Sequence, residues 1–372
     1  MLVKNFSICK FIGLIDLFLY ILIIPLFSKV YNLNIEYSRL HLISNYEQIT
    51  LKFNVTGSQK ILNPEFQTCP DIIYLNSDTS NNIVDENNCS IIYLPPNVNE
   101  NYSVQLIWNS ELNDTSSMFK GLKNILSVDL SKFNSYFITN TTMMFYGCES
   151  IISINFYNFT TPSLVDLRYM FYNCFSLSKF NLTFLDTSKV TDMSYLFYGC
   201  RKMHTLNLDN FRTSNVENMS YMFGECENLG SLDLSNFDTS SVTDIKYMFF
   251  QNKRLQFLDI SNFDTSKVNS MEFTFKDCGK LTYLNLSNFD TSQVTNMDNM
   301  FNGCTRLLFL DLSSFTTPKL KIMNSMFRSC YGLTSINFQN FDTSQVTTMS
   351  FLFYHCISLA NLDLSSFNTS NV

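Results

Sequence analysis

The chain has 372 residues, of which 45% are hydrophobic and 15% are charged, and its formal net charge is −7. This apolar fraction excludes a disordered chain, and an acidic balance without a basic tract argues against a nucleic-acid-binding protein. The length suits either two domains or an array, and 36 Phe, 19 Tyr and 16 Met beside a single Trp favour a short unit copied many times.

The N-terminal segment 1–28 is expected to direct the protein out of the cytosol. Lys4 and Lys10 precede an apolar run from Phe11 to Phe27, which is typical of a secretory signal peptide. An uncleaved signal anchor is the alternative, for which a run of about 17 residues is at the lower limit. Both alternatives place the remaining chain in a secreted or cell-surface location, because the lysines stay in the cytosol.

Residues 29–112 lack any repeat and are predicted to form a small β-rich N-terminal domain. The segment Gln48–Val55 alternates apolar and polar residues, and Asp71–Leu75, Ser90–Leu94 and Val104–Trp108 add further β-rich runs. We expect this domain to cap the first coil of the array that follows, because an open end would expose the core.

The leading domain contains two cysteines, Cys69 and Cys89. In an extracytoplasmic compartment we expect a disulfide between them, and two free thiols are the alternative.

The rest of the chain, 113–372, is an array of about ten 26-residue repeats whose last copy is incomplete. Phenylalanines recur at this spacing without an insertion or deletion: Phe119, Phe145, Phe171, Phe197, Phe223, Phe249, Phe275, Phe301, Phe327 and Phe353. Such strict register predicts a stack of near-identical coils. Because Val372 stops partway through a repeat, we expect the sequence to be a fragment of a longer protein.

The residue pattern of each repeat predicts one short strand followed by a second short element. Leu229, Leu232 and Leu234 follow an L-x-x-L-x-L spacing, in which the last two lie on one face of a strand. The segment 242–249 then has a helical or 3₁₀ period, and a second short strand over 242–245 is the alternative. We therefore predict an α/β-type repeat solenoid with a short parallel strand in each coil.

The unit Met222–Phe223–Gly224–Glu225–Cys226 and its continuation resemble the BspA-type leucine-rich repeats of microbial surface proteins. The repeat in its 26-residue form is M-F-x-x-C-x-x-L-x-x-L-D-L-S-N-F-D-T-S-x-V-T-D-M, and the resemblance covers about 113–372. It implies a secreted or surface-displayed protein linked to adhesion. Ligands vary among proteins that share this scaffold, so the resemblance implies no particular one.

Eight cysteines follow the ladder phenylalanines by three residues, and they are predicted to be structural. Stacked thiols point the same way, which is poor geometry for a disulfide, and Cys packs well as a small buried group, although bridges between neighbouring coils are the alternative. No second ligand stands at a zinc-binding spacing, so we expect no metal. This cysteine ladder comprises Cys148, Cys174, Cys200, Cys226, Cys278, Cys304, Cys330 and Cys356.

One column of residues is predicted to face outward between the two inward strand residues, and it is always Asp or Asn. This stripe is either a solubilising surface, whose members hydrogen-bond between coils, or a recognition surface for a protein, a glycan or a divalent cation. Its members are Asp129, Asn155, Asn181, Asn207, Asp233, Asp259, Asn285, Asp311, Asn337 and Asp363. Ligand choice would depend on the variable residues two positions earlier, which are Lys179, Thr205, Phe257, Tyr283 and Phe309.

The sequence contains no nucleophile elbow, phosphate-binding loop or zinc-protease motif, so we expect no catalytic site and no cofactor. Beyond the N-terminal segment 1–28, ten Asn-x-Ser/Thr sequons would make the protein a glycoprotein in a host that glycosylates. The function that these patterns favour is non-catalytic binding to a protein or glycan on a cell surface or matrix. The alternative is a structural coat or spacer without a dedicated ligand.

Overall fold

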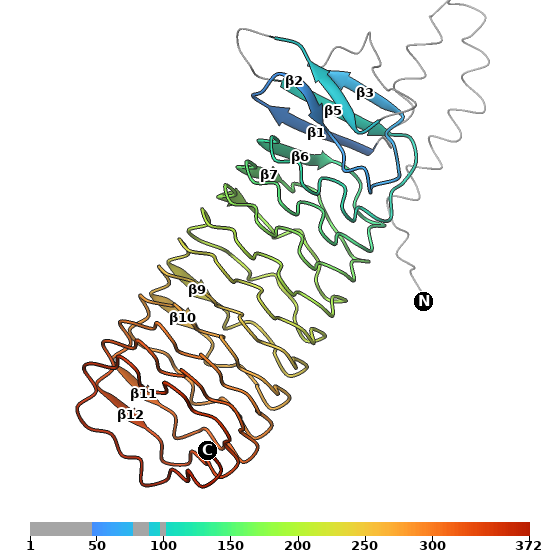
Figure 1. Ribbon diagram of the computed structural model, residues 1–372. Coiled ribbons are helices and arrows are strands. Elements are labelled where there is room, and N and C mark those ends of the chain that lie inside the picture. Colours follow the sequence, from blue (N-terminus) through green and yellow to red (C-terminus); the bar gives the residue numbers. More distant parts are fainter. Residues whose placement is uncertain (1–46, 77–88, 97–101) are drawn as a thin grey trace, which may run out of the picture. The chain divides into compact units, whose positions relative to one another are not determined.

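The computed structural model describes residues 47–76, 89–96 and 102–372, which belong to one compact unit, Tyr46–Val372. The expected signal segment 1–28 and the start of the expected leading domain lie outside the described residues. Short strands and turns build this unit (Figure 1).

The leading residues form five antiparallel strands. They are β1 (Glu47–Phe53), β2 (Gly57–Lys60), β3 (Ile72–Leu75), β4 (Ile91–Leu94) and β5 (Tyr102–Trp108). Strand β1 pairs with β5, β3 pairs with the other side of β5, and β2 pairs with β4 in a separate two-stranded sheet. Alternating residues of β1 are fully buried, as the sequence pattern requires.

The first coil of the array is covered by β1. Strand β6 (Ser127–Lys132) pairs antiparallel with β1, so that Leu51 lies opposite Val128. With β7 (Ser153–Asn155) and β8 (Lys179–Phe180), the resulting sheet runs in the order β3-β5-β1-β6-β7-β8 and joins the leading strands to the first coils. The expected boundary between 112 and 113 therefore does not divide the structure, because the cap and the array share one sheet.

The coils stack in parallel, with partners 26 residues apart. Leu232 pairs with Leu258, and Leu310 with Ile336. The remaining strands are β9 (Ser231–Asp233), β10 (Phe257–Asp259), β11 (Phe309–Asp311) and β12 (Ser335–Asn337).

The strands differ from the prediction in two respects. The three-residue strands begin one residue earlier than the leucine spacing suggested, at Ser231 rather than Leu232. The coils at 205–208, 283–286 and 361–364 carry no strand, so the expectation of a strand in each coil was wrong. Parallel pairing of only three residues is weak, and small changes in coil spacing are enough to lose it.

The structure contains no helix in the residues that it describes, which corrects the α/β prediction. In the segment 242–249, Asp244 makes a single parallel bridge to Asn218, and a turn follows with Tyr247 at a φ of +57°. The backbone N–H of Phe249 donates to the carbonyl of Thr274 in the next coil, whereas a helix would use a carbonyl four residues back. The apolar residues of this segment therefore have their spacing because they belong to a turn that packs between two neighbouring coils.

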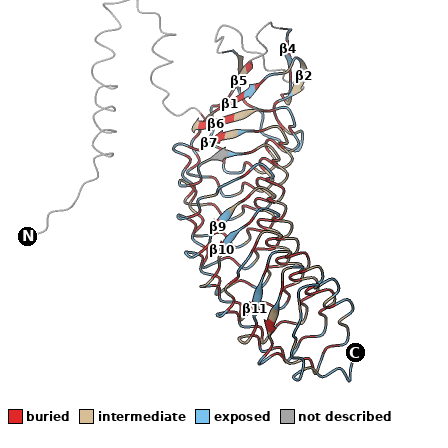
Figure 2. Cartoon of the chain, turned by 90° about the vertical axis from the view of Figure 1, so that its left-hand side faces the viewer, coloured by how far each residue is buried: buried red, intermediate tan, exposed pale blue. Residues whose placement is uncertain are grey.

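Stacked side chains fill the core of the array. The ladder phenylalanines lie with their ring centroids 5.5–5.9 Å apart from coil to coil. Buried and exposed residues alternate along each coil, so both surface columns and core columns run through the array (Figure 2).

A column of buried threonines also joins the coils. Each hydroxyl donates to a backbone carbonyl 25 residues later over 2.8–3.0 Å, which satisfies a polar group inside the core. The column comprises Thr187, Thr213, Thr239, Thr265, Thr291, Thr317 and Thr343.

Candidate binding surface

The Asp/Asn stripe lies on the outer face of the strand column. Leu232 and Leu234 are buried on either side of exposed Asp233, because alternate strand residues point to opposite faces. All ten members of the stripe are exposed or half-buried. The structure thus places the predicted stripe residues together along one face.

The stripe side chains also shape the backbone. Each Oδ1 accepts the backbone N–H of the residue two positions later; for Asp233 the partner is Ser235 at 2.9 Å. This bond forms an Asx turn at the same position of every coil. The Ser235 hydroxyl and backbone N–H hold the pKa of the Asp233 carboxyl below its usual value. The period of Asp and Asn therefore has a structural cause that is independent of any ligand.

Direct bonds between neighbouring stripe members occur at both ends of the array. Asn155 Nδ2 donates to Asp129 Oδ1 at 3.0 Å, and Asn337 Nδ2 donates to Asp311 Oδ1 at 3.0 Å. Hydrogen bonds between stripe members thus link particular pairs of coils, whereas all ten stripe members form the Asx turn.

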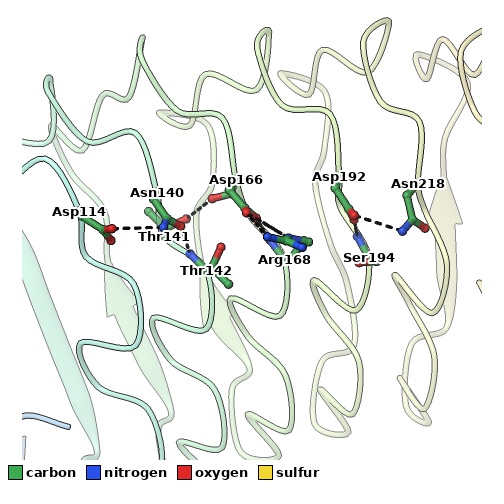
Figure 3. Close-up of polar contacts among 9 residues, drawn as sticks. All are labelled: Asp114, Asn140, Thr141, Thr142, Asp166, Arg168, Asp192, Ser194 and Asn218. Atoms are coloured by element: carbon green, nitrogen blue, oxygen red, sulfur yellow. Dashed lines mark hydrogen bonds and ion pairs between the residues drawn. The ribbon is translucent and has the colours of Figure 1, made fainter. Parts of the chain in front are cut away.

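A second column, which holds Asp or Asn in most coils, follows the parallel bridges and was not predicted from the sequence. Asn140 Nδ2 donates to Asp114 Oδ2 at 3.3 Å, and Asn218 Nδ2 donates to Asp192 Oδ2 at 3.2 Å (Figure 3). Within the column, Asp166 forms an ion pair with Arg168 at 2.6 Å. The aspartate of the V-T-D-M segment recurs with the same period, although Ser270, Ile322 and Thr348 replace it in three coils, and this was the signal that could have revealed the column.

The cysteine ladder provides hydrogen-bond donors as well as packing. Each Sγ lies 2.9–3.3 Å from the carbonyl oxygen of the ladder phenylalanine in the preceding coil. Asn252, in the slot without cysteine, donates from Nδ2 to the carbonyl of Phe223 at 3.0 Å. All eight thiols are free, and Cys356 is half-buried whereas the others are buried. Burial raises the pKa of the Cys148 thiol to about 12, which keeps it protonated as a donor.

Cys69 and Cys89 form a disulfide, with their Cα atoms 5.7 Å apart. The bond joins the segment before β3 to the segment before β4, and so links the two sheets of the leading residues.

Three aromatic residues form a row beside the stripe. Phe257, Tyr283 and Phe309 stand two positions before Asp259, Asn285 and Asp311, and all three are exposed. We call these three residues the aromatic row.

A pocket of about 370 Å³ opens within this surface. Strand β10 pairs with β9 and β11 pairs with β12, but the coil between them carries no strand at 283–286, so the sheet is interrupted there. The pocket is lined by Tyr283, Leu284, Asn285, Leu286, Ser287, Phe309, Asp311, Ser313 and Ser314.

A second group of aromatic side chains lies on the turns of the coils. Tyr169, Tyr195, Tyr221, Tyr247 and Phe273 stack with ring centroids 4.3–4.6 Å apart. We call them the tyrosine stack. Each ring covers the face of its neighbour, so this column presents ring edges and contributes chiefly to packing between coils.

The described part of the chain contains no group of His, Cys, Asp and Glu arranged to hold a metal ion. Nor does that part contain a helix long and apolar enough to cross a membrane.

Comparison with known families matches the array four times. The family described as "Mycoplasma protein of unknown function, DUF285" matches 97–205, 165–284, 200–307 and 278–372. These overlapping matches cover about three quarters of the chain. The chain belongs to this family. A search of the curated proteins finds no match.

Proposed function

We propose that this DUF285 protein is a secreted or surface-displayed repeat protein that binds a partner on a cell surface or matrix, without catalysis. The observation that carries this proposal is the strand face. A stripe held in fixed orientation by Asx turns lies beside a column whose side chain changes from Ser to Phe or Tyr between coils. Constant scaffold and variable surface residues are the arrangement by which repeat proteins present binding surfaces.

The repeat type that we propose is the BspA-type leucine-rich repeat. Leu229, Leu232 and Leu234 are all buried, as the L-x-x-L-x-L spacing requires. The family match supports this assignment at the level of a repeat protein.

The proposed location outside the cytosol draws support from the Cys69–Cys89 disulfide, because disulfides persist in oxidising compartments. The signal segment 1–28 remains a prediction from its sequence.

Binding of the labelled full chain to cells and to immobilised matrix proteins tests this function. We expect saturable binding that excess unlabelled protein displaces. If the protein only associates with itself, the coat or spacer function replaces this proposal.

A matched variant tests the part played by the stripe. Replacing Asp233 and Asp259 with Asn keeps the Oδ1 acceptors of both turns and removes two charges. Weaker binding at an unchanged melting temperature would assign recognition to the carboxylates. Unchanged binding would place the contact on the variable column instead.

A further inference from the structure

The aromatic row carries large apolar side chains at a position where the other coils do not. In the other coils this column carries small or polar residues: Ser127, Ser153, Lys179, Thr205, Ser231, Ser335 and Asn361. Phe257, Tyr283 and Phe309 are 55%, 66% and 44% exposed, so their rings contribute little to the core. Leu308, which is also exposed, adjoins the row at Phe309. Three such replacements on consecutive coils form an exposed apolar strip that packing does not explain.

The rings of the row are exposed and do not stack on one another in the described structure. The described structure shows no ring contact among Phe257, Tyr283 and Phe309, whereas rings of the tyrosine stack lie 4.3–4.6 Å apart. Neighbouring coils are separated by roughly the 4.8 Å of adjacent strands. The row therefore offers one exposed ring in each of three consecutive coils.

Polar groups with fixed directions flank these rings. Asn285 Oδ1 accepts the backbone N–H of Ser287 at 3.1 Å, which leaves its Nδ2 without a partner in the described structure. Asp259 Oδ1 accepts both the N–H and the hydroxyl of Ser261, and its other carboxylate oxygen makes no bond to a described residue. The pocket beside Tyr283 thus combines an exposed ring with an available amide donor.

We propose that the aromatic row and its pocket bind a neutral carbohydrate chain. A hexose ring has a C–H face that packs on an aromatic ring, and a hydroxyl edge that bonds to carboxylates and amides. One hexose unit in an extended chain is close in length to the spacing between coils. The flanking aspartates and the net charge of −7 disfavour an acidic glycan.

This inference rests on the proposed surface-binding function and names the ligand class. A protein partner fits the same strip less well, because the core of a protein interface is a broad apolar patch and this row is largely one side chain wide.

Calorimetric titration of the full chain with cellohexaose, maltohexaose and the fully N-acetylated chitohexaose tests the proposal. We expect binding of at least one of these neutral hexamers. The variant Phe257→Ser, Tyr283→Ser, Phe309→Ser should weaken that affinity by about tenfold or more. Serine already occupies the same position in four other coils, so we expect the variant to fold with an unchanged melting temperature.

The control replaces Ser231 and Ser335, which lie on either side of the row in the same column, with Ala and should leave the affinity unchanged. The variant Asn285→Asp keeps the turn acceptor but removes the amide donor, and it should also weaken binding. Absence of binding to all three hexamers, or equal binding by the triple-serine variant, would overturn the proposal.

Cell binding separates this inference from the proposed function. If saturable binding to cells survives enzymatic removal of their surface glycans, the carbohydrate proposal fails and the surface-binding function stands. Loss of this binding when the glycans are removed supports both the carbohydrate proposal and the surface-binding function. Without saturable cell binding the surface-binding function fails, and the hexamer titration still decides the carbohydrate proposal.

Discussion

Asn252 shows how strictly a single position in the repeat is specified. It is fully buried and takes over the donor role of the ladder cysteines through its Nδ2. Its Oδ1, which has no counterpart in cysteine, is buried without a hydrogen-bond partner. From the second coil onward this position carries a small side chain with a donor, and asparagine supplies the donor at the cost of one unpaired acceptor, whereas Leu122 fills the same position in the first coil.

We expect Asn252→Cys to raise the free energy of unfolding by about 1–2 kcal/mol, because it removes the unpaired acceptor and keeps a donor for the carbonyl of Phe223. Asn252→Val is the matched control: it also removes the acceptor but takes away the side-chain donor to that carbonyl, which then keeps only the longer bond from the Cys226 N–H at 3.4 Å, so it should stabilise less. Urea unfolding of the three proteins measures the difference. A cysteine variant no more stable than the valine variant would contradict the donor role.

At the scale of elements, the junction between β1 and β6 closes the array. Glu47, the first residue of β1, is buried and accepts the backbone N–H of Asn134 at 2.7 Å through Oε2. Burial, together with the nearby Glu111 carboxylate, raises the pKa of Glu47 to about 7. The folded protein is therefore more stable when the Glu47 carboxyl group in this junction is protonated.

This raised pKa makes stability depend on pH. Between about 4.5 and 7 the folded state binds more protons at Glu47 than the unfolded state does, so its contribution to stability falls as the pH rises through this range. Glu47→Gln keeps the acceptor and carries no charge. We expect the variant to be more stable than the wild type by roughly 2–3 kcal/mol at pH 8 and similar to it near pH 4. Thermal unfolding across this range measures the difference, and a constant gap at every pH would contradict the assignment.

At the scale of the whole unit, the bonds between coils define a period of 26 residues. The threonine column, the cysteine ladder and the strand pairs each connect one coil to the next at a fixed sequence offset. The array is therefore extended or shortened by whole coils, and its stability is a sum over neighbouring pairs.

Deletion of Ser188–Thr213 removes 26 residues and joins Thr187 to Ser214, which preserves the repeat. We expect this protein to fold with a modest loss of stability, because two interfaces between coils are replaced by one of the same kind. Deletion of Lys189–Thr213, one residue fewer, puts the columns out of register at the junction. The melting temperature should be far lower for the second protein, and equal melting temperatures would contradict a strict period.

The sequence alone determined the period, the buried columns and the outward stripe. All three can be recognised from the residue types that recur every 26 positions. They recur because each side chain packs against the equivalent side chain of the next coil. The N-terminal cap was also predictable, because an exposed core requires a cover.

Only the tertiary structure decided where hydrogen bonds run between coils. It showed that the thiols donate to phenylalanine carbonyls and that β1 pairs with β6. It also showed a turn in the segment 242–249, for which the sequence had predicted a helical period. It distinguished stacked tyrosines from the exposed rings of Phe257, Tyr283 and Phe309. Each of these features depends on distances between residues far apart in sequence, which a local pattern of residue types does not contain.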